Sequence, residues 1–422
     1  MKQVTKRNGQ KEEFNFEKIK IAVGKAIGSQ DPNKWETTTG KLIGPVLVQA
    51  LKTGVNNLFS DQDGEVSVED IQDVVERIMM VNEYYDAAKR YILYREEHRK
   101  IRERDYVILN RMKEKLEAKN IENQNANVDE MSFGGRVGEA SRIALKQLAL
   151  SDYMSETSRN NHINNEIYIH DLDSYAIGDH NCLSIPFDDL LAKGFNTRQT
   201  DVRPANSINT AFQLVAVIFQ LQSLQQFGGV AATHLDWTMV PYVRKSFIKH
   251  WRDGYHYIAG ATDELDWEYL KTLPINSRCF TEKYPEVYNY ALDMTIKELN
   301  QAAEGLFHNL NTLQSRSGNQ LPFTSINYGT CTLYEGQLVI DALLNASIKG
   351  VGKFHKTPIF PCSIFQCMKG INRAPGDPNY YLFQKALKST ALRLYPNYVN
   401  VDWTVNEGYD PKNPLTYTST MG

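Results

Sequence analysis

Two clusters of residues in this chain have side chains whose types and spacing could do chemistry. The first is the stretch IYIHDLDSYAIGDHNCLSIPF, which contains His170, Asp171, Asp173, Asp179, His180, Asn181 and Cys182. Histidines and carboxylates near a thiol could ligate a metal ion or activate a cysteine nucleophile. The spacing fits neither well, because it has no HExxH motif and no two histidines placed for one face of a helix. The residues alone favour loop hydrogen bonds for His170 and Asp173 and simple packing for Cys182.

The second cluster is basic and lies near the start of the chain. Lys6 and Arg7 precede the dipeptide Asn8-Gly9, and Glu12 and Lys18 follow it. Two adjacent cations beside a turn that presents backbone amides could hold the phosphates of a nucleotide, with Lys18 adding charge from the first turn of a helix. A basic hairpin tip is more often only a solvated turn. The residues alone therefore leave both interpretations open.

The elements that must position the basic cluster can be read from capping and turn signals. Residues 4–14 predict two short strands joined at Asn8-Gly9, a dipeptide that tolerates the positive φ angles of a type I′ turn. A helix follows with Asn15 as its N-cap, and a further helix opens at Ser67, where SVED forms a capping box. From YREEHRKIRERDY to about residue 120 the pattern is helical and highly charged, which suits a solvated connecting helix.

The pattern of apolar and polar residues changes from residue 131 onward, in the part of the chain that contains the first cluster, here called the thiol cluster. Long helical segments alternate with strand-like runs such as EIYIHDL, NCLSIPF and TPIFPCSIF, which favours an α/β fold with strands buried between helices. One predicted helix has Ser207 as its N-cap and Gly228-Gly229 as its stop, and it is apolar on more than one face. Such a helix must be buried in the core or against another subunit.

Composition limits the function classes. A chain of 422 residues with 42% hydrophobic residues predicts at least two domains. The formal charge of −3 gives no global basic field for DNA, RNA or an anionic membrane. No signal peptide or membrane span is evident, so a cytoplasmic protein is expected. The cysteines are odd in number and lack a CxxC pair, which predicts reduced thiols and no metal site; they are Cys182, Cys279, Cys331, Cys362 and Cys367.

Three separated blocks in the first hundred residues resemble the ATP-cone, the regulatory module of ribonucleotide reductases. They are VTKRNGQKEEFNFEKIKIAVGKAI, VSVEDIQDVVE and DAAKRYILYREEHR, in the family's order. The resemblance implies that residues 1–100 form a domain that binds ATP or dATP as allosteric effectors. The matching positions for nucleotide binding are Lys6, Arg7, Asn8, Gly9, Glu12 and Lys18.

Most of residues 131–422 resemble anaerobic, glycyl-radical (class III) ribonucleoside-triphosphate reductase. The matching blocks are YIHDLDSY, HNCLSIPF, FGGVAATHLDW, SRSGNQLPFTSINYGT and GVGKFHKTPIFPCSIFQCMKGINRAPGDPNY. The resemblance implies an α/β fold in which residues 101–130 connect the cone to the first, larger part of a ten-stranded α/β barrel. Asn181 and Cys182 match the block of the reducing cysteine, and we expect substrate contacts from His170, Asp171 and Asp173.

The activity implied is anaerobic reduction of ribonucleoside triphosphates to deoxyribonucleoside triphosphates. In the family a radical-SAM enzyme installs a glycyl radical, which generates a thiyl radical that abstracts the ribose 3′ hydrogen. The cysteine matched by Cys182 then assists loss of the 2′-OH, and formate is the expected reductant.

We interpret Cys362 and Cys367 as residues of a packed strand, and Cys279 and Cys331 as structural too. SRSGNQLPFTSINYGT lacks the order of a phosphate loop and is interpreted as barrel wall that could contact substrate.

The sequence departs from the family at its end. In the family, the segment resembling YTSTMG is followed by the thiyl-forming cysteine, whereas this chain stops at Gly422. We therefore expect an N-terminal part whose glycyl radical and structural zinc lie in a remaining C-terminal part. An upstream extein, a split gene and an arbitrary truncation, in that order, would explain the end. The expected assembly is a homodimer through the helix at 207–227. The alternative function is a non-catalytic module that senses ATP or dATP.

Overall fold

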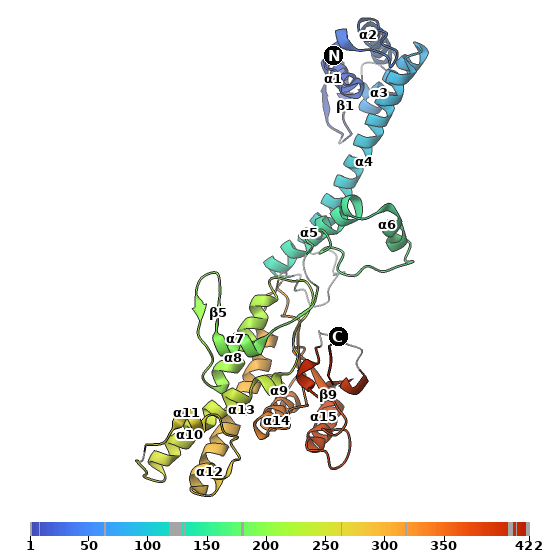
Figure 1. Ribbon diagram of the computed structural model, residues 1–422. Coiled ribbons are helices and arrows are strands. Elements are labelled where there is room, and N and C mark those ends of the chain that lie inside the picture. The colour runs from blue at the N-terminus through green and yellow to red at the C-terminus, as the bar shows by residue number, and fades with distance from the viewer. Residues whose placement is uncertain are drawn as a thin grey trace. The chain divides into compact units, whose positions relative to one another are not determined.

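The computed structural model divides the chain into two compact units, Met1–Asn110 and Arg111–Gly422 (Figure 1). The structure describes residues 2–7, 9–62, 65–117, 129, 131–178, 181–262, 264–316, 319–403, 408–410 and 412–418. Each unit has its own hydrophobic core. In this described part of the chain, no helix combines the length and the apolar character needed to span a membrane.

The first unit combines a small sheet with helices. Strands β1 (Gln3–Thr5) and β2 (Lys11–Glu13) form the predicted antiparallel hairpin, and β3 (Glu65–Ser67) pairs in parallel with β1. The helices are α1 (Phe16–Ile27), α2 (Gly44–Asp61), α3 (Val68–Val81) and the start of α4 (Tyr85–Leu116), with a short 3₁₀ helix at Pro32–Lys34. Trp35 and the inward faces of these helices fill the core, including Val23, Leu47, Leu51, Val55, Val75 and Met79.

Both predicted helix starts in this unit are confirmed. The Asn15 side chain accepts a hydrogen bond from the Glu17 amide, and Ser67 and Asp70 form a reciprocal capping box. These side chains satisfy amides that have no partner inside the helix. The charged helix is also present, as the single helix α4, which runs without a break past residue 100. Residues 118–128 and 130 of the predicted connector lie outside the described residues.

The second unit is built on a parallel sheet of five strands in the order β10-β9-β8-β7-β4. These strands are β4 (Leu183–Ser184), β7 (Val230–Ala232), β8 (Thr324–Tyr328), β9 (Cys362–Cys367) and β10 (Asn397–Asn400). A two-stranded hairpin, β5 (Phe195–Asn196) with β6 (Asp201–Val202), stands apart from the sheet. The predicted α/β class is confirmed. The ten-stranded barrel is not seen among the described residues, whose largest sheet leaves β4 and β10 at its edges.

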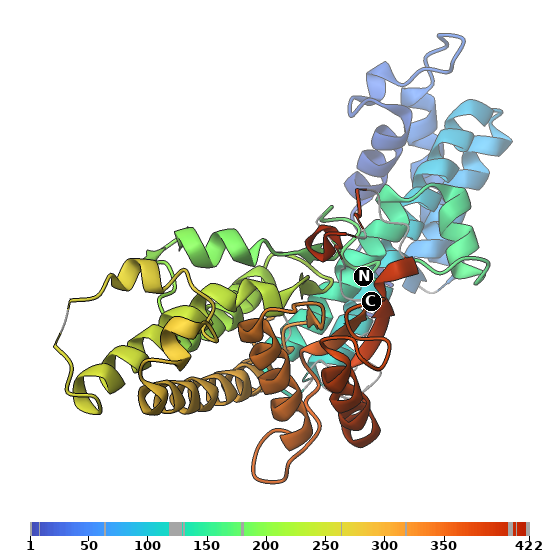
Figure 2. The same ribbon diagram turned by 60° about the horizontal axis from the view of Figure 1, so that its bottom comes forward.

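Helices bury one another and the sheet in this unit. Helix α13 (Pro285–Thr312) packs along α8 (Ile208–Gln222), α10 (Val240–Tyr257) and α14 (Tyr334–Lys349), and α10 and α13 run side by side in both views (Figures 1 and 2). Helix α15 (Tyr380–Arg393) packs on α14. The remaining helices are α5 (Phe133–Leu148), η2 (Ala149–Tyr153), α6 (Glu156–Ile163), α7 (Phe187–Lys193), α9 (Leu235–Thr238), α11 (Trp267–Leu270), α12 (Arg278–Thr281), η3 (Val401–Trp403) and η4 (Pro414–Thr416).

Two sequence predictions near the thiol cluster are wrong. The run at residues 166–172 forms no strand: it bends at 166–167 and turns from 170 onward, and Asn165 and Asp171 have left-handed φ angles of 60° and 52° that an extended chain does not adopt. The helix predicted to reach residue 227 ends at Gln222. Beyond it, side chains of Gln226 and Arg316 hydrogen-bond the backbone carbonyls of residues 227–229, so the chain leaves the helix before the glycines.

Candidate functional site

The basic hairpin is closed by backbone hydrogen bonds and carries its cations on one side of the turn. The Lys6 amide donates to the Gln10 carbonyl at 2.7 Å, and the Gly9 amide donates to the Lys6 carbonyl at 2.9 Å. Gly9 has a φ of +80°, a conformation that glycine adopts without strain. Asn8, which was predicted to contact nucleotide, lies outside the described residues. The turn therefore places Lys6 and Arg7 next to each other at the end of β1.

Lys6 and Lys18 converge on a single carboxylate. Lys6 Nζ lies 2.8 Å from one oxygen of Glu12, and Lys18 Nζ lies 2.7 Å from the other. The hydrogen bonds from Lys18 and Lys6 hold the pKa of Glu12 below its ordinary value. The structure thus brings together three of the predicted nucleotide contacts from β1, β2 and α1.

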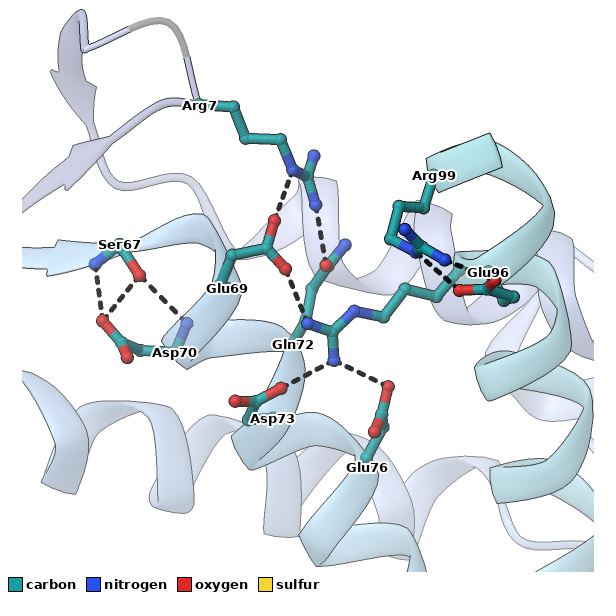
Figure 3. A network of polar contacts seen from close by, with 10 residues as sticks. Arg7, Ser67, Glu69, Asp70, Gln72, Asp73, Glu76, Glu96 and Arg99 are labelled. Carbon is teal, nitrogen blue, oxygen red and sulfur yellow. Dashed lines mark hydrogen bonds and ion pairs between the residues drawn. The ribbon is translucent and has the colours of Figure 1, made fainter. Parts of the chain in front are cut away.

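Arg7 points away from that group toward helix α3. Its guanidinium donates to Glu69 and, at 2.8 Å, to Gln72 (Figure 3). Burial raises the pKa of Glu69, but the hydrogen bonds from Arg7 and Arg95 outweigh burial and lower the pKa overall. Arg7 is thus already bonded to a carboxylate of the same chain. A phosphate bound at the hairpin would compete with Glu69 for the Arg7 guanidinium.

Arg95 of α4 connects this contact to the rest of the first unit. Its guanidinium bonds Glu69 at 2.6 Å, and also Asp73 at 2.6 Å and Glu76 at 2.9 Å. Burial by itself would lower the pKa of Arg95, but the hydrogen bonds to Glu76, Asp73 and Glu69 raise it overall. A single carboxylate, Glu69, is therefore shared between the hairpin and helix α4.

In the second unit, Cys182 lies immediately before the edge strand β4. Its sulfur accepts a hydrogen bond from the Gly229 amide at 3.2 Å, and its thiol donates to Asn181 Oδ1 at 3.5 Å. The thiol is half-buried. The residues before β4 and before β7 thus meet at the amino ends of these two neighbouring strands. The thiol both donates and accepts a hydrogen bond there.

A cavity of about 540 Å³ is lined in part by residues 223–227, which precede the glycines that contact Cys182, and Cys182 itself does not line it. Its walls are α5, the turns around residue 174, the end of α8, and Arg316. Arg316 donates to the Gly228 carbonyl at 3.0 Å and to the Phe227 carbonyl, and its guanidinium lies 3.9 Å from the centre of the Phe323 ring. Burial and the nearby charge of Arg142 lower the pKa of Arg316 to about 10.

The predicted substrate contacts are separated by the fold. Asp173 is buried, lines the cavity and lies 3.6 Å from Nε of Arg142. His170 and Asp171 are exposed and bond each other at 2.6 Å, and neither lines the cavity. Asp179 and His180 lie outside the described residues. Among the residues that the structure does describe, no three His, Cys, Asp or Glu side chains are grouped to hold a metal ion.

The remaining thiols lie in different surroundings from Cys182. Cys331 is fully buried, and burial raises its pKa. Cys362 and Cys367 are the two ends of β9, and burial raises the pKa of Cys367 to about 11. Burial also raises the pKa of Cys362, against a hydrogen bond with Tyr395 that lowers it. Cys279 is exposed and 2.8 Å from the Ser277 hydroxyl.

Sequence reasoning did not single out Arg316, Arg142 or Gln226. Arg316 lies in a segment that the sequence indicates as barrel wall, and Gln226 lies in the last turn of the helix predicted to reach residue 227. The only signal for Arg316 was a lone arginine in a short polar segment with a glycine. Such segments are common in loops, so the signal does not point to one partner.

Comparisons with known proteins give two family matches. A model described as anaerobic ribonucleoside-triphosphate reductase matches residues 124–421, and one described as ATP cone domain matches residues 2–100. The chain is 29% identical to the anaerobic ribonucleoside-triphosphate reductase of Haemophilus influenzae, over 99% of this chain and 55% of that protein. The protein of the same name from Escherichia coli is also 29% identical, over 99% and 54%. The chain thus spans about half the length of these relatives.

Other similarities are local or distant. A ribonucleoside-diphosphate reductase subunit alpha from Chlamydia muridarum is 35% identical over 103 residues, which are 24% of this chain and 10% of that protein. The crystal structure of the anaerobic ribonucleotide reductase from Thermotoga maritima with dATP bound in the specificity site is 13% identical. It has a TM-score of 0.45 and covers 72% of this chain and 50% of that one.

Proposed function

We propose, since the chain belongs to the anaerobic ribonucleoside-triphosphate reductase family, that it supplies the effector-binding cone and the reducing thiol of such an enzyme. The substrate class is ribonucleoside triphosphates and the products are deoxyribonucleoside triphosphates. The observation that carries the proposal is Cys182, a half-buried thiol that accepts a hydrogen bond from the Gly229 amide at 3.2 Å. A thiol is required because its S–H bond is weak enough to exchange a hydrogen atom with a ribose carbon.

The roles of individual residues follow from this proposal. Cys182 assists removal of the ribose 2′-OH. The Asn181 amide oxygen orients the hydrogen of the Cys182 thiol. Asp173 contacts the substrate from the cavity wall, and His170 and Asp171 contribute from the exposed turn beside it. The glycyl radical supplies the hydrogen-abstracting chemistry when it is present. We assign that radical, its radical-SAM activating enzyme, formate as reductant and structural zinc to the enzyme assembled with its C-terminal part.

The cone is proposed to bind ATP or dATP as allosteric effectors at the hairpin. Lys6, Lys18 and Arg7 would bond phosphate oxygens, with Glu12 holding the two lysines together and Gly9 giving the turn its shape. Each charge-assisted bond should contribute about 1.5–3 kcal/mol. Calorimetry with ATP on the full chain tests this, and unchanged affinity in the Lys6→Ala/Arg7→Ala variant would remove the site from the hairpin.

A homodimer through α8 is the proposed assembly. Most apolar residues of α8 are buried within the chain, but Leu221 in its last turn is 40% exposed, and Leu224, which follows the helix and also lines the cavity, is 56% exposed. These side chains are the surface that a second copy would cover. The chain should sediment as a dimer at micromolar concentration, and a monomer there would count against this interface.

Activity separates the enzyme proposal from the alternative of a non-catalytic nucleotide sensor. The chain should gain reductase activity when it is assembled, without oxygen, with a C-terminal part carrying a glycyl radical. Deoxynucleotide formation is measured. Binding of ATP with no activity in any assembly would favour the sensor instead.

A further inference from the structure

Cys182 rests against the turn at residues 226–229, here called the thiol turn, which joins α8 to β7. Three hydrogen bonds tie the thiol turn to the segment that carries the cysteine, and one of them runs from the Leu183 amide to the Gly229 carbonyl at 3.1 Å. The Gly229 amide donates to the sulfur at 3.2 Å, and the Gln226 side chain donates to the Asn181 carbonyl at 3.4 Å. The same Gln226 amide also donates to the Gly229 carbonyl at 2.7 Å. The geometry of the sulfur therefore depends on the shape of this turn.

The fit between the two segments is tight at Gly228. A Cβ added there would lie 2.0 Å from the Asn181 carbonyl oxygen and 2.1 Å from its Oδ1. Atoms cannot approach that closely, and the nearest neighbour is backbone, so any side chain at this position would push the two segments apart. Glycine is required here by close approach of the backbone to Asn181.

Arg316 also holds the thiol turn, through two of its carbonyls. Its planar guanidinium donates to two successive carbonyls, those of Phe227 and Gly228, and its flat face lies on the Phe323 ring at 3.9 Å. The residue is only 6% exposed. A guanidinium can bond two carbonyls in one plane while stacking on a ring, whereas the single ammonium of lysine cannot do both.

We propose that Arg316 is a positioning residue for Cys182, acting through the thiol turn, with Gln226 and Gly228 as the contacts that transmit its effect. The inference rests on the proposed function only in assigning a reaction to the thiol. Arg316 holds the carbonyls of residues 227 and 228 in place. Their position sets the direction of the Gly229 N–H, and this N–H orients the Cys182 sulfur through its hydrogen bond. Released from this support, the turn would move away and leave the thiol more accessible and no longer oriented.

The test measures the rate at which iodoacetamide alkylates Cys182 in the full chain, with exposed Cys279 of the same molecule as internal reference. Mass spectrometry gives the ratio of the two rates. Arg316→Lys and Gly228→Ala disturb the turn through different contacts, and each should raise the ratio about tenfold, the factor worth roughly one hydrogen bond to a charged group. The two variants change different residues of the same support. A rise of the alkylation ratio in both would therefore not be an artefact of one substitution.

Two matched controls separate positioning from general loss of stability. Arg393 also donates to three backbone carbonyls, those of Ile348, Lys349 and His355, but lies on α15 away from the thiol. Gly305 lies within α13, and a Cβ there would meet nothing within 4 Å. Arg393→Lys and Gly305→Ala should leave the ratio at its wild-type value.

A ratio that stays at or below the wild-type value in Arg316→Lys and Gly228→Ala would overturn the proposal. So would an equal rise in the two controls. Arg316 also lines the cavity, so kcat and KM of Arg316→Lys in the assembled enzyme separate two effects: a misplaced thiol lowers kcat with little change in KM, whereas a lost substrate contact raises KM. The alkylation result needs no turnover, so it stands or falls separately from the reductase activity itself.

Discussion

At the scale of single residues, the surroundings of the five thiols differ enough to predict their roles. Cys182→Ser in the assembled enzyme should abolish deoxynucleotide formation, because a hydroxyl at that position cannot give up a hydrogen atom to the ribose. The glycyl radical should still form, since it belongs to another segment; electron paramagnetic resonance checks this. Cys362→Ser should cost only packing, on the order of 1 kcal/mol, with turnover retained. An active Cys182→Ser with an inactive Cys362→Ser would show that the wrong thiol has been assigned.

Glu69 is predicted to oppose nucleotide binding at the hairpin. Its carboxylate bonds Arg7, and the two side chains are 47% and 38% exposed, so the pair should contribute less than about 1 kcal/mol. Glu69→Gln should therefore strengthen ATP binding by about two- to fivefold, measured by calorimetry on the full chain.

A nearby glutamate provides the control for charge. Glu65 also carries one negative charge and bonds Lys11 at 2.6 Å, without touching Arg7. Glu65→Gln should leave ATP affinity nearly unchanged. Weaker binding in Glu69→Gln would mean that Glu69 instead prepares Arg7 for the phosphate.

At the scale of elements, Glu298 joins three helices of the second unit. Its carboxylate lies 2.8 Å from Nε2 of His250 on α10 and accepts from the Ser246 hydroxyl at 3.2 Å and the Asn209 amide of α8 at 3.4 Å. Burial opposes ionisation of Glu298, but the bonds from His250 and Asn209 outweigh it and lower its pKa. The stabilisation is therefore present above the ordinary glutamate value near 4.5 and is lost as pH falls through the lower pKa of the folded state.

The pH dependence of stability tests this junction. Glu298→Gln should lower the free energy of unfolding by about 1–3 kcal/mol at pH 7, because partly buried donors lose an ionised acceptor. The loss should shrink as pH falls below 4.5, since the unfolded wild-type chain then takes up a proton at Glu298 while the folded carboxylate is still ionised. Urea unfolding at pH 7 and pH 4 measures both. Glu304→Gln, which removes a more exposed pair with Lys349, should cost less than about 1 kcal/mol. An equal loss for Glu298→Gln at both pH values would contradict the account.

At the scale of the whole molecule, the two units have separate cores and should unfold separately. Heating the full chain should therefore give two transitions by calorimetry. ATP at about a hundred times its dissociation constant should stabilise only the unit that contains the hairpin, by about 2.7 kcal/mol. For a unit of this size that corresponds to a rise in Tm on the order of 10 °C. The Lys6→Ala/Arg7→Ala variant should show no such rise. A shift of both transitions would mean that the nucleotide acts beyond the first unit.

The sequence by itself determined what depends on near neighbours. The hairpin at Asn8-Gly9, the N-cap at Asn15, the capping box at Ser67 and the charged helix α4 are set by contacts within a few residues, which a linear pattern records. The α/β class and the family also follow from blocks of sequence. The role of Cys182 came from the resemblance, because the residues around it by themselves favour a packed cysteine.

Only the tertiary structure decided which distant residues meet. Arg316, which is far along the chain from α8, holds the carbonyls of Phe227 and Gly228 in the turn that follows this helix. Likewise Arg7 binds Glu69 rather than joining Lys6 at Glu12, and Asp173 lines a cavity that His170 and Asp171 do not reach. Side-chain partners of this kind are chosen by packing and desolvation over the whole fold, and no local spacing encodes them.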